Sequence, residues 1–203
     1  MKNINHKNTV IFWLLLLPAF VKADSPLTST PFHDAYIDED IVLRAEQTNV
    51  MTKDFAEFLH SKIYPIDLKA ALINAIGWNL NGMNNSEEYC RIIFNKKTDE
   101  IKLEDLNSED LFVIGYLKAM ENYFEPEKAE KYLREARKRM KKSFTVAVIY
   151  ALFKSQIAME NDFCRVWKIV DKVFRNKNLK QDMRESAKKI IYDYIVVYKE
   201  YCN

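Results

Sequence analysis

The sequence predicts an all-helical protein, and three observations lead to this prediction. The chain of 203 residues has only 3 Gly and 5 Pro, although 48% of its residues are hydrophobic. β-Sandwiches and barrels need many turn residues, and disordered chains lack apolar residues, so both classes are excluded. Apolar residues recur at helical spacing after position 35, and pairs of predicted helices repeat with a period of about 34 residues.

The N-terminal segment, residues 1–23, has the pattern of a secretory signal. A basic start is followed by a mostly apolar run over residues 10–21 and by small residues up to Ala23. This run has about 12 residues, whereas a transmembrane helix needs roughly 20. Cleavage before Asp24 is therefore favoured over an uncleaved anchor. We expect an exported protein, either periplasmic or extracellular.

Removal of this segment changes the charge balance. The whole chain has a formal net charge of +2, with 31 basic and 29 acidic side chains. Three of the lysines lie before Asp24 and no acidic residue does, so 28 basic side chains remain against 29 acidic ones. This balance is not typical of nucleic-acid or membrane-surface binding. We expect no nucleic-acid partner and no stable membrane insertion after cleavage.

The mature chain is predicted to begin with an extended arm over residues 24–34, which contain two Pro and several Ser and Thr. A single all-helical domain follows over residues 35–203. Short apolar stripes predict its first helices near residues 37–45 and 55–59. Pro65 favours the start of a mostly buried helix that extends to Leu80.

Paired helices are predicted for the rest of the chain. Asn107 and Ser143 are suitable N-terminal caps, and Pro126 suits a first helical turn. The connections after Ser143 are short, so neighbouring helices are expected to be antiparallel. The expected helices begin near residues 86, 108, 126, 143 and 162, and a long last helix covers residues 180–201.

The repeat period is visible in both helices of a pair. Shifting residues 126–142 onto 160–176 aligns Tyr132 with Val166, Leu133 with Trp167 and Ala136 with Val170. The preceding helices align Tyr116-Leu117 with Tyr150-Ala151. This pattern resembles the tetratricopeptide repeat (TPR), in which helix pairs stack into a solenoid. The match lacks the small residue at Leu117 and the closing Pro at Lys141 and Arg175, and an irregular helical bundle is the alternative.

The resemblance is clearest over residues 108–176 and implies a short TPR-like α-solenoid with residues 180–201 as its cap. It also implies a groove, lined by the first helices, that binds a protein or peptide partner without catalysis. The partner-binding residues expected there are Lys118, Asn122, Lys154 and Gln156.

A second hypothesis is an exported small-ligand binder or enzyme with a pocket near His60, Tyr64 and Trp78. The sequence contains no metal-binding, phosphate-loop or hydrolase motif, so we expect no catalytic residue, cofactor or metal. The acidic run Asp38-Glu39-Asp40 lacks the spacing of a calcium loop and is interpreted as a helix cap. The basic residues between Lys128 and Lys142 alternate with glutamates at i, i+4 spacing, which is typical of a solvated helix face.

Three cysteines remain after the signal segment. Cys90 and Cys164 lie in helical patterns among apolar residues, so both are predicted to be buried free thiols. If they occupy comparable positions in stacked units, their Cα atoms are too far apart for a disulfide. Cys202 lies next to the C-terminus and is interpreted as a frayed terminal thiol or as a link between two chains.

Overall fold

The computed structural model describes residues 25–78, 84–122 and 125–202, and the predicted signal segment lies outside these ranges. Within them the chain forms α- and 3-10 helices and no strand, which confirms the all-helical prediction. The α-helices are α1 (Asp40–Thr48), α2 (Lys53–His60), α3 (Ile66–Ile76), α4 (Asn85–Phe94), α5 (Ser108–Glu121), α6 (Glu127–Arg139), α7 (Phe144–Met159), α8 (Phe163–Phe174) and α9 (Glu185–Ile195). The 3-10 helices are η1 (Phe32–Tyr36), η2 (Thr98–Glu100), η3 (Leu103–Asp105) and η4 (Val196–Tyr201).

Helix starts follow from side-chain caps in the sequence. The Asn107 side chain accepts hydrogen bonds from two backbone N–H groups of the first turn of α5. Ser143 accepts one from the first turn of α7, and Asp162 accepts one from the first turn of α8. These bonds satisfy N–H groups that have no partner within the helix. The local sequence therefore determines where these helices begin.

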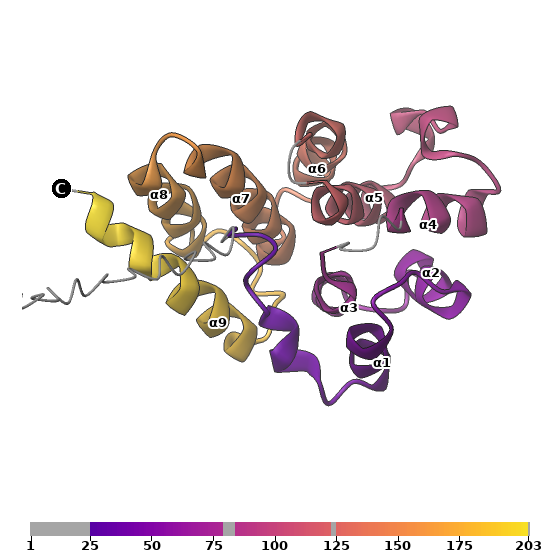
Figure 1. Cartoon of the computed structure of the whole chain (residues 1–203), viewed down its shortest axis with the longest axis horizontal. Helices are drawn as coiled ribbons and strands as arrows, with labels where there is room; N and C mark the ends of the chain where they lie inside the picture. The colour runs from indigo at the N-terminus through magenta and orange to yellow at the C-terminus, as the bar shows by residue number, and fades with distance from the viewer. Residues whose placement is uncertain (1–24, 79–83, 123–124, 203) are drawn as a thin grey trace, which may run out of the picture.

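Two helix pairs form the centre of the molecule. Helix α5 packs along α6, and α7 packs along α8, while α6 and α5 both contact α7 (Figure 1). The paired helices were predicted from the repeat, and their arrangement as a TPR-like solenoid remains a prediction. Helix α3 joins the pairs to the N-terminal helices, because it contacts α1, α5 and α7.

The repeat register agrees with burial in part. Tyr132 and Val166, which the repeat aligns, are both buried, and the next aligned pair, Leu133 and Trp167, is buried as well. The register differs at the start of the second helices, because Ala129 is buried whereas the aligned Phe163 is 41% exposed. Common burial positions therefore extend over the middle of α6 and α8 but not over their first turns.

Helix α3 is shorter than predicted. It ends at Ile76 because Gly77, at the C-cap, has a positive φ of 76°. Residues other than glycine rarely adopt this backbone conformation. Trp78 is therefore outside the helix and is 44% exposed, rather than part of a buried stripe. The predicted end near Leu80 lies outside the described residues.

The arm predicted to be extended is folded onto the protein in its described part. Residues 25–29 form a turn in which the Ser29 N–H donates to the Ser25 carbonyl at 2.9 Å. Leu27 is fully buried, and η1 follows at Phe32. In Figure 1 this segment starts beside α7 and descends between α9 and α1. Packing of Leu27 and Phe32 against the helices outweighs the local turn signals that predicted an extended arm.

The C-terminal region also differs from the predicted continuous helix over residues 180–201. Helix α9 begins only at Glu185, and its last turn continues into the 3-10 helix η4. Before α9, the Lys180 N–H donates to the Lys142 carbonyl at 2.7 Å, and Lys180 thereby forms an isolated parallel bridge with Ser143. This backbone pairing prevents Lys180 from belonging to the helix.

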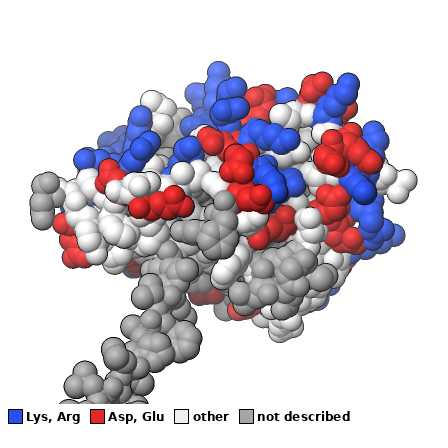
Figure 2. All heavy atoms as spheres, turned by 45° about the horizontal axis from the view of Figure 1, so that its top comes forward, with Lys and Arg blue, Asp and Glu red and all other residues white. Residues whose placement is uncertain are grey.

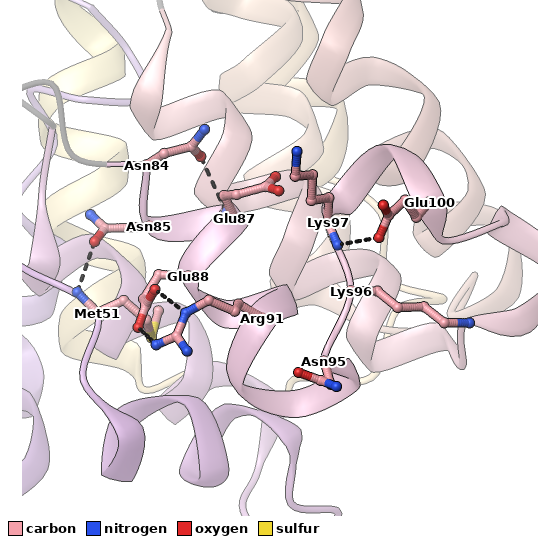
Figure 3. Close-up of a pocket in the computed structure, with 10 residues that line it drawn as sticks. All are labelled: Met51, Asn84, Asn85, Glu87, Glu88, Arg91, Asn95, Lys96, Lys97 and Glu100. Carbon is pink, nitrogen blue, oxygen red and sulfur yellow. Dashed lines mark hydrogen bonds and ion pairs between the residues drawn. The ribbon is translucent and has the colours of Figure 1, made fainter.

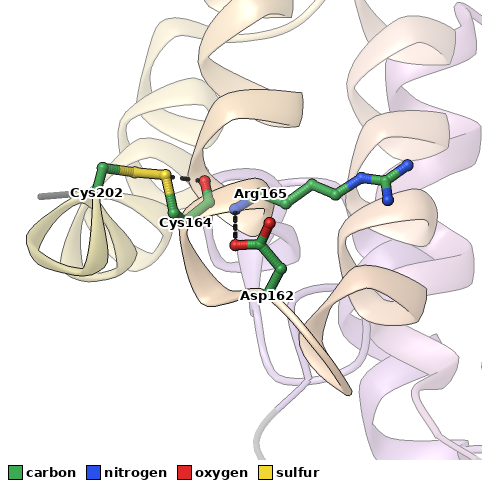
Figure 4. Close-up of a disulfide and its surroundings, with 4 residues drawn as sticks. All are labelled: Asp162, Cys164, Arg165 and Cys202. Atoms are coloured by element: carbon green, nitrogen blue, oxygen red, sulfur yellow. Dashed lines mark hydrogen bonds between the residues drawn. A yellow bond between two sulfur atoms is a disulfide. The ribbon is translucent and has the colours of Figure 1, made fainter.

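The cysteine predictions are correct for Cys90 and wrong for the other two. Cys90 is buried and free, and it forms no bond with Cys164. Cys164 instead forms a disulfide with Cys202, with a Cα–Cα distance of 4.7 Å (Figure 4). Packing of η4 along α8 brings the end of the chain to the first turn of α8, a proximity that sequence spacing does not show.

Candidate functional site

A hollow lies beside α4 and the segment after it, and we call it the α4 pocket. Its volume is about 730 Å³. Figure 3 shows side chains from both sides of the hollow, with α4 and the 95–100 segment supplying most of them. The lining residues are Met51, Asn84, Asn85, Glu87, Glu88, Arg91, Asn95, Lys96, Lys97 and Glu100.

One ion pair and two hydrogen bonds engage four of the charged side chains of the α4 pocket and the backbone of a fifth charged residue. The Arg91 guanidinium pairs with the Glu88 carboxylate at 2.5 Å, and the backbone N–H of Lys97 donates to the Glu100 carboxylate at 2.9 Å. The Glu87 carboxylate accepts the Thr98 hydroxyl at 2.5 Å. The described lining contains lysines and glutamates but no histidine, cysteine or hydroxyl group. The α4 pocket is therefore a hollow whose described lining has three basic and three acidic side chains.

Behind the α4 pocket lies a carboxyl group with an altered pKa. Glu121, the last residue of α5, accepts hydrogen bonds from the backbone N–H and the hydroxyl of Ser86, the latter at 2.9 Å. Burial raises the pKa of Glu121 to about 7, although the bonds from Ser86 oppose this effect. Glu121 thus titrates near neutral pH at the N-terminal turn of α4.

The hypothesis of a pocket near His60 finds a polar network there. His60 Nδ1 lies 2.8 Å from Asp110 Oδ1, and the Tyr89 hydroxyl donates to the same oxygen at 2.7 Å. Asp110 is 2% exposed, and Asn107 donates to its other oxygen at 2.5 Å. Burial and the neighbouring Asp110 raise the pKa of Tyr89 far above its usual value. The network anchors α2 and α4 to the first turn of α5.

The three residues of that hypothesis are not gathered around one hollow. Tyr64 stacks on Phe58 at a centroid distance of 3.8 Å and lines a groove whose described lining includes neither His60 nor Trp78. His60 instead contacts the edge of Phe94 at 5.8 Å. The geometry therefore brings His60 to Asp110 and Tyr89, and it leaves Tyr64 in a different environment.

The groove that Tyr64 lines is the second notable hollow, and we call it the basic groove. It has a volume of about 560 Å³, within the range of ligand-binding pockets. The α2–α3 connection, the α6–α7 connection and the segment before α9 form its walls. The lining residues are Lys62, Ile63, Tyr64, Pro65, Ile66, Glu109, Arg139, Met140, Lys141, Lys142, Ser143, Lys180 and Asp182.

Hydrogen bonds to backbone carbonyls hold the walls of the basic groove. The Lys180 bridge to Ser143 joins the segment before α9 to the start of α7. The Arg137 guanidinium donates to the Lys141 carbonyl at 2.7 Å and so closes the α6–α7 turn. Helices α3, α5 and α7 all begin at the groove, and helix N-termini carry partial positive charge.

The basic groove has an excess of positive charge. Five basic side chains line it against two carboxylates, and one of these, Glu109, is paired with the fully buried Lys69. The side chains of Lys62, Lys141, Lys142 and Lys180 form no ion pair with the described part of the chain. The face in Figure 2, by contrast, shows basic and acidic side chains interspersed.

Exposed apolar side chains accompany this charge. Ile63 is 87% exposed and Tyr64 40%, and both lie at the groove. Stacking against the Phe58 ring holds the Tyr64 ring in its position at the groove. The combination of lysines without ion pairs and presented apolar groups fits a ligand that is both acidic and apolar.

The partner-binding residues predicted from the repeat have different surroundings. Lys118 lines a smaller hollow of about 370 Å³ with Lys128 and Lys131. Lys154 pairs with Glu130 at 3.0 Å, so this glutamate is bonded to α7 rather than to Arg134, its i, i+4 neighbour on α6. The Asn122 side chain donates to Glu125 at 2.7 Å.

Gln156 is not on an open face. It is 3% exposed, and its side-chain oxygen accepts a hydrogen bond from the Ser25 hydroxyl at 2.5 Å. The folded N-terminal segment therefore covers Gln156, and we leave this residue out of any partner surface. The sequence could not reveal the cover, because Ser25 and Gln156 are 131 residues apart.

The basic groove escaped the sequence interpretation because its parts come from three distant connections. The apolar Ile63-Tyr64 pair next to Lys62, between two predicted helices, was the available local signal.

No helix among the described residues is both long enough and apolar enough to cross a bilayer. Comparisons with family models, with curated proteins and with solved structures find no match to this chain.

Proposed function

We propose that this protein is an exported interaction module whose basic groove binds an acidic segment of a partner protein, with an apolar side chain of that segment resting on Ile63 and Tyr64. The observation that carries the proposal is the set of lysines without ion pairs around two presented apolar residues. A local excess of positive charge of this kind is suited to steering and orienting an acidic partner. No reaction is required.

Export is supported by two independent features. The segment before Asp24 has a signal-like pattern, and the Cys164–Cys202 disulfide is typical of an oxidising compartment such as the periplasm or the extracellular space. Stacking of the α5–α6 and α7–α8 pairs as a TPR-like solenoid, with α9 and η4 as its end, is part of the same proposal. In such a solenoid the basic groove lies where helices begin, rather than along the first-helix face predicted from the repeat.

Fluorescence anisotropy with three short labelled peptides tests the proposed function. The first peptide places Leu-Phe between runs of Glu, the second replaces Glu by Gln, and the third replaces Leu-Phe by Ser-Ser. We expect saturable binding of the first peptide and at least roughly tenfold weaker binding of the other two, since tenfold corresponds to about 1.4 kcal/mol. Higher salt is expected to weaken binding.

Charge reversal locates the site. The K141E/K142E variant is expected to bind the acidic peptide at least about tenfold more weakly, whereas the control K168E/K177E changes exposed lysines outside the groove and retains binding. The I63S variant is expected to lose the preference for Leu-Phe over Ser-Ser. Unchanged binding by K141E/K142E contradicts the proposal, and loss of binding only in K118E/K131E assigns the partner to the hollow near Lys118 instead.

A further inference from the structure

A histidine and two carboxylates from different elements meet at the N-terminal end of the described chain. His33 and Asp34 belong to η1, and Glu46 belongs to α1. His33 Nε2 lies 3.6 Å from an Asp34 oxygen and 3.7 Å from a Glu46 oxygen, and all three atoms are within 4.8 Å of one another. The imidazole is largely buried, whereas the two carboxylates are open to solvent at 56% and 46% exposure.

The other ring nitrogen of His33 is held by a residue outside this cluster. His33 Nδ1 lies 2.8 Å from the side-chain oxygen of Asn74, which is 4% exposed. The same oxygen accepts the His33 backbone N–H at 3.0 Å, and the Asn74 NH₂ group donates to the Thr30 carbonyl at 3.1 Å. These two backbone partners identify which Asn74 atom is oxygen. Nδ1 must therefore carry the ring proton, and in the neutral ring Nε2 presents its lone pair.

This arrangement groups three electron-pair donors around one point. A neutral His33 directs a lone pair at two carboxylates, and the carboxylates also repel each other. A buried group that fixes the tautomer and orientation of a histidine by accepting its other N–H is the usual companion of a metal ligand. Asn74 supplies this support from the middle of α3, independently of the acidic residues.

We propose that His33 Nε2, Asp34 and Glu46 bind one divalent transition-metal ion of the Zn²⁺ type. Zn²⁺ binds His nitrogen and carboxylate oxygen at about 2.0–2.2 Å, so its tetrahedral ligands lie roughly 3.3–3.5 Å apart. The separations of 3.6 and 3.7 Å from Nε2 are close to this value before any adjustment. Ca²⁺ instead takes 6–8 oxygen ligands, and an imidazole does not suit it.

Three protein ligands leave a fourth position of the tetrahedron for water or for a donor from a partner molecule. The ion would also connect η1 to α1. Because η1 packs on α3 and α9, this connection would strengthen the attachment of the N-terminal segment. The metal site is separate from the proposed peptide site, since no residue of the cluster lines the basic groove.

His60 provides the matched control. It also has Nδ1 bound to a buried oxygen, that of Asp110, but the described residues place no second carboxylate against its ring. If a supported histidine alone were sufficient, both residues would bind metal. The proposal requires that only His33 does.

Isothermal titration of the chelator-treated, disulfide-bonded mature chain with ZnCl₂ tests the site. We expect one ion per chain, at least roughly tenfold weaker binding in E46Q and H33Q, and unchanged binding in H60Q. E46Q changes an exposed side chain and leaves the imidazole in place, so it answers the question even if H33Q folds poorly. A Co²⁺ absorption spectrum without a thiolate band is expected, which separates the site from Cys90.

Three results overturn the proposal. One is absence of saturable Zn²⁺ binding by the wild-type chain. Another is equal affinity of the wild-type chain and E46Q. The third is equal affinity for MgCl₂ and ZnCl₂, because Mg²⁺ does not need the imidazole.

Discussion

The guanidinium group of Arg184 lies over the ring of Tyr36, 4.5 Å from its centroid, although the two residues are 148 positions apart. Arg184 also donates to the Ala35 carbonyl at 3.0 Å and to Asp38 at 2.5 Å, and it pairs with Glu39. The Tyr36 hydroxyl accepts the Arg184 backbone N–H at 3.1 Å. The start of α9 is thereby fastened to η1, and two acids of the Asp38-Glu39-Asp40 run serve this contact.

Replacement of Arg184 by Ala is expected to destabilise the protein by about 2 kcal/mol, because it removes a cation–π contact and several charge-assisted hydrogen bonds. Chemical denaturation monitored by circular dichroism measures the change. R175A is the control, since the exposed Arg175 side chain has one ion pair among the described residues, with Asp171 one turn earlier, and its expected effect is below about 0.5 kcal/mol. Equal effects of the two variants would show that the Arg184 contacts contribute no more than a surface ion pair.

The Cys164–Cys202 disulfide is expected to stabilise the fold by about 4 kcal/mol, because it closes a loop with a sequence separation of 38. The C164S/C202S variant should therefore unfold roughly 10 °C lower in a thermal scan. Both cysteines are replaced so that no new thiol can link two chains. Treatment of the wild type with a reductant is expected to lower its midpoint similarly and to leave the variant unchanged. A response of the variant to reductant contradicts this assignment.

Cys90 is expected to resist alkylation in the native protein. Burial raises the pKa of its thiol to about 11, so very little thiolate is present at pH 8. Mass spectrometry after iodoacetamide treatment should find Cys90 unmodified in the folded state and modified in denaturant. A non-reducing peptide map should connect the Cys164 and Cys202 peptides. Rapid labelling of Cys90 in the folded protein would contradict its burial.

Glu121 is expected to make stability fall as the pH rises. Its pKa is about 7 in the folded protein and about 4.5 in the unfolded chain, so between these values the folded state holds a proton that the unfolded state releases. The contribution of Glu121 to the free energy of unfolding is fully present below about pH 4.5. It is lost as the pH rises through about 7, and the loss is at most about 3 kcal/mol. Denaturation midpoints between pH 5 and 8 measure this loss.

The E121Q variant is expected to lack this dependence and to exceed the wild type in stability at pH 8. Glutamine has the same shape, and the Ser86 hydroxyl can donate instead to Asn84, which lies 3.1 Å away. E57Q, at an exposed position on α2, should retain the wild-type pH dependence. Parallel pH curves for the wild type and E121Q would contradict the raised pKa.

Replacement of Gly115 by Ala is expected to cost about 1–3 kcal/mol. A Cβ atom there would lie 2.9 Å from the backbone nitrogen of Leu133 and from Cβ of Tyr132, so α6 would have to move away from α5. Alanine favours a helix by about 1 kcal/mol over glycine, which offsets only part of this cost. S186A, at an exposed position on α9, is the control with little expected effect. If G115A were more stable than the wild type, α5 and α6 would have to lie farther apart at Gly115 than in this structure.

Local features of the sequence account for much of the secondary structure. Helix starts at Ser108, Phe144 and Phe163 follow from caps one residue earlier, whose side chains bond to the first turn. The burial of Cys90 likewise follows from its apolar neighbours. The end of α3 was predicted too late, since the backbone conformation of Gly77 stops the helix before the apolar stripe ends.

The sequence by itself determined the helical class, the paired helices and their caps, because these depend on residues within a few turns of one another. Only the tertiary structure decided the partner of Cys202, the cover over Gln156 and the meeting of His33 with Glu46. The basic groove belongs to this second group, since three separate connections form it. Such sites depend on how whole helices pack, and that packing is set by many long-range contacts that no local pattern contains.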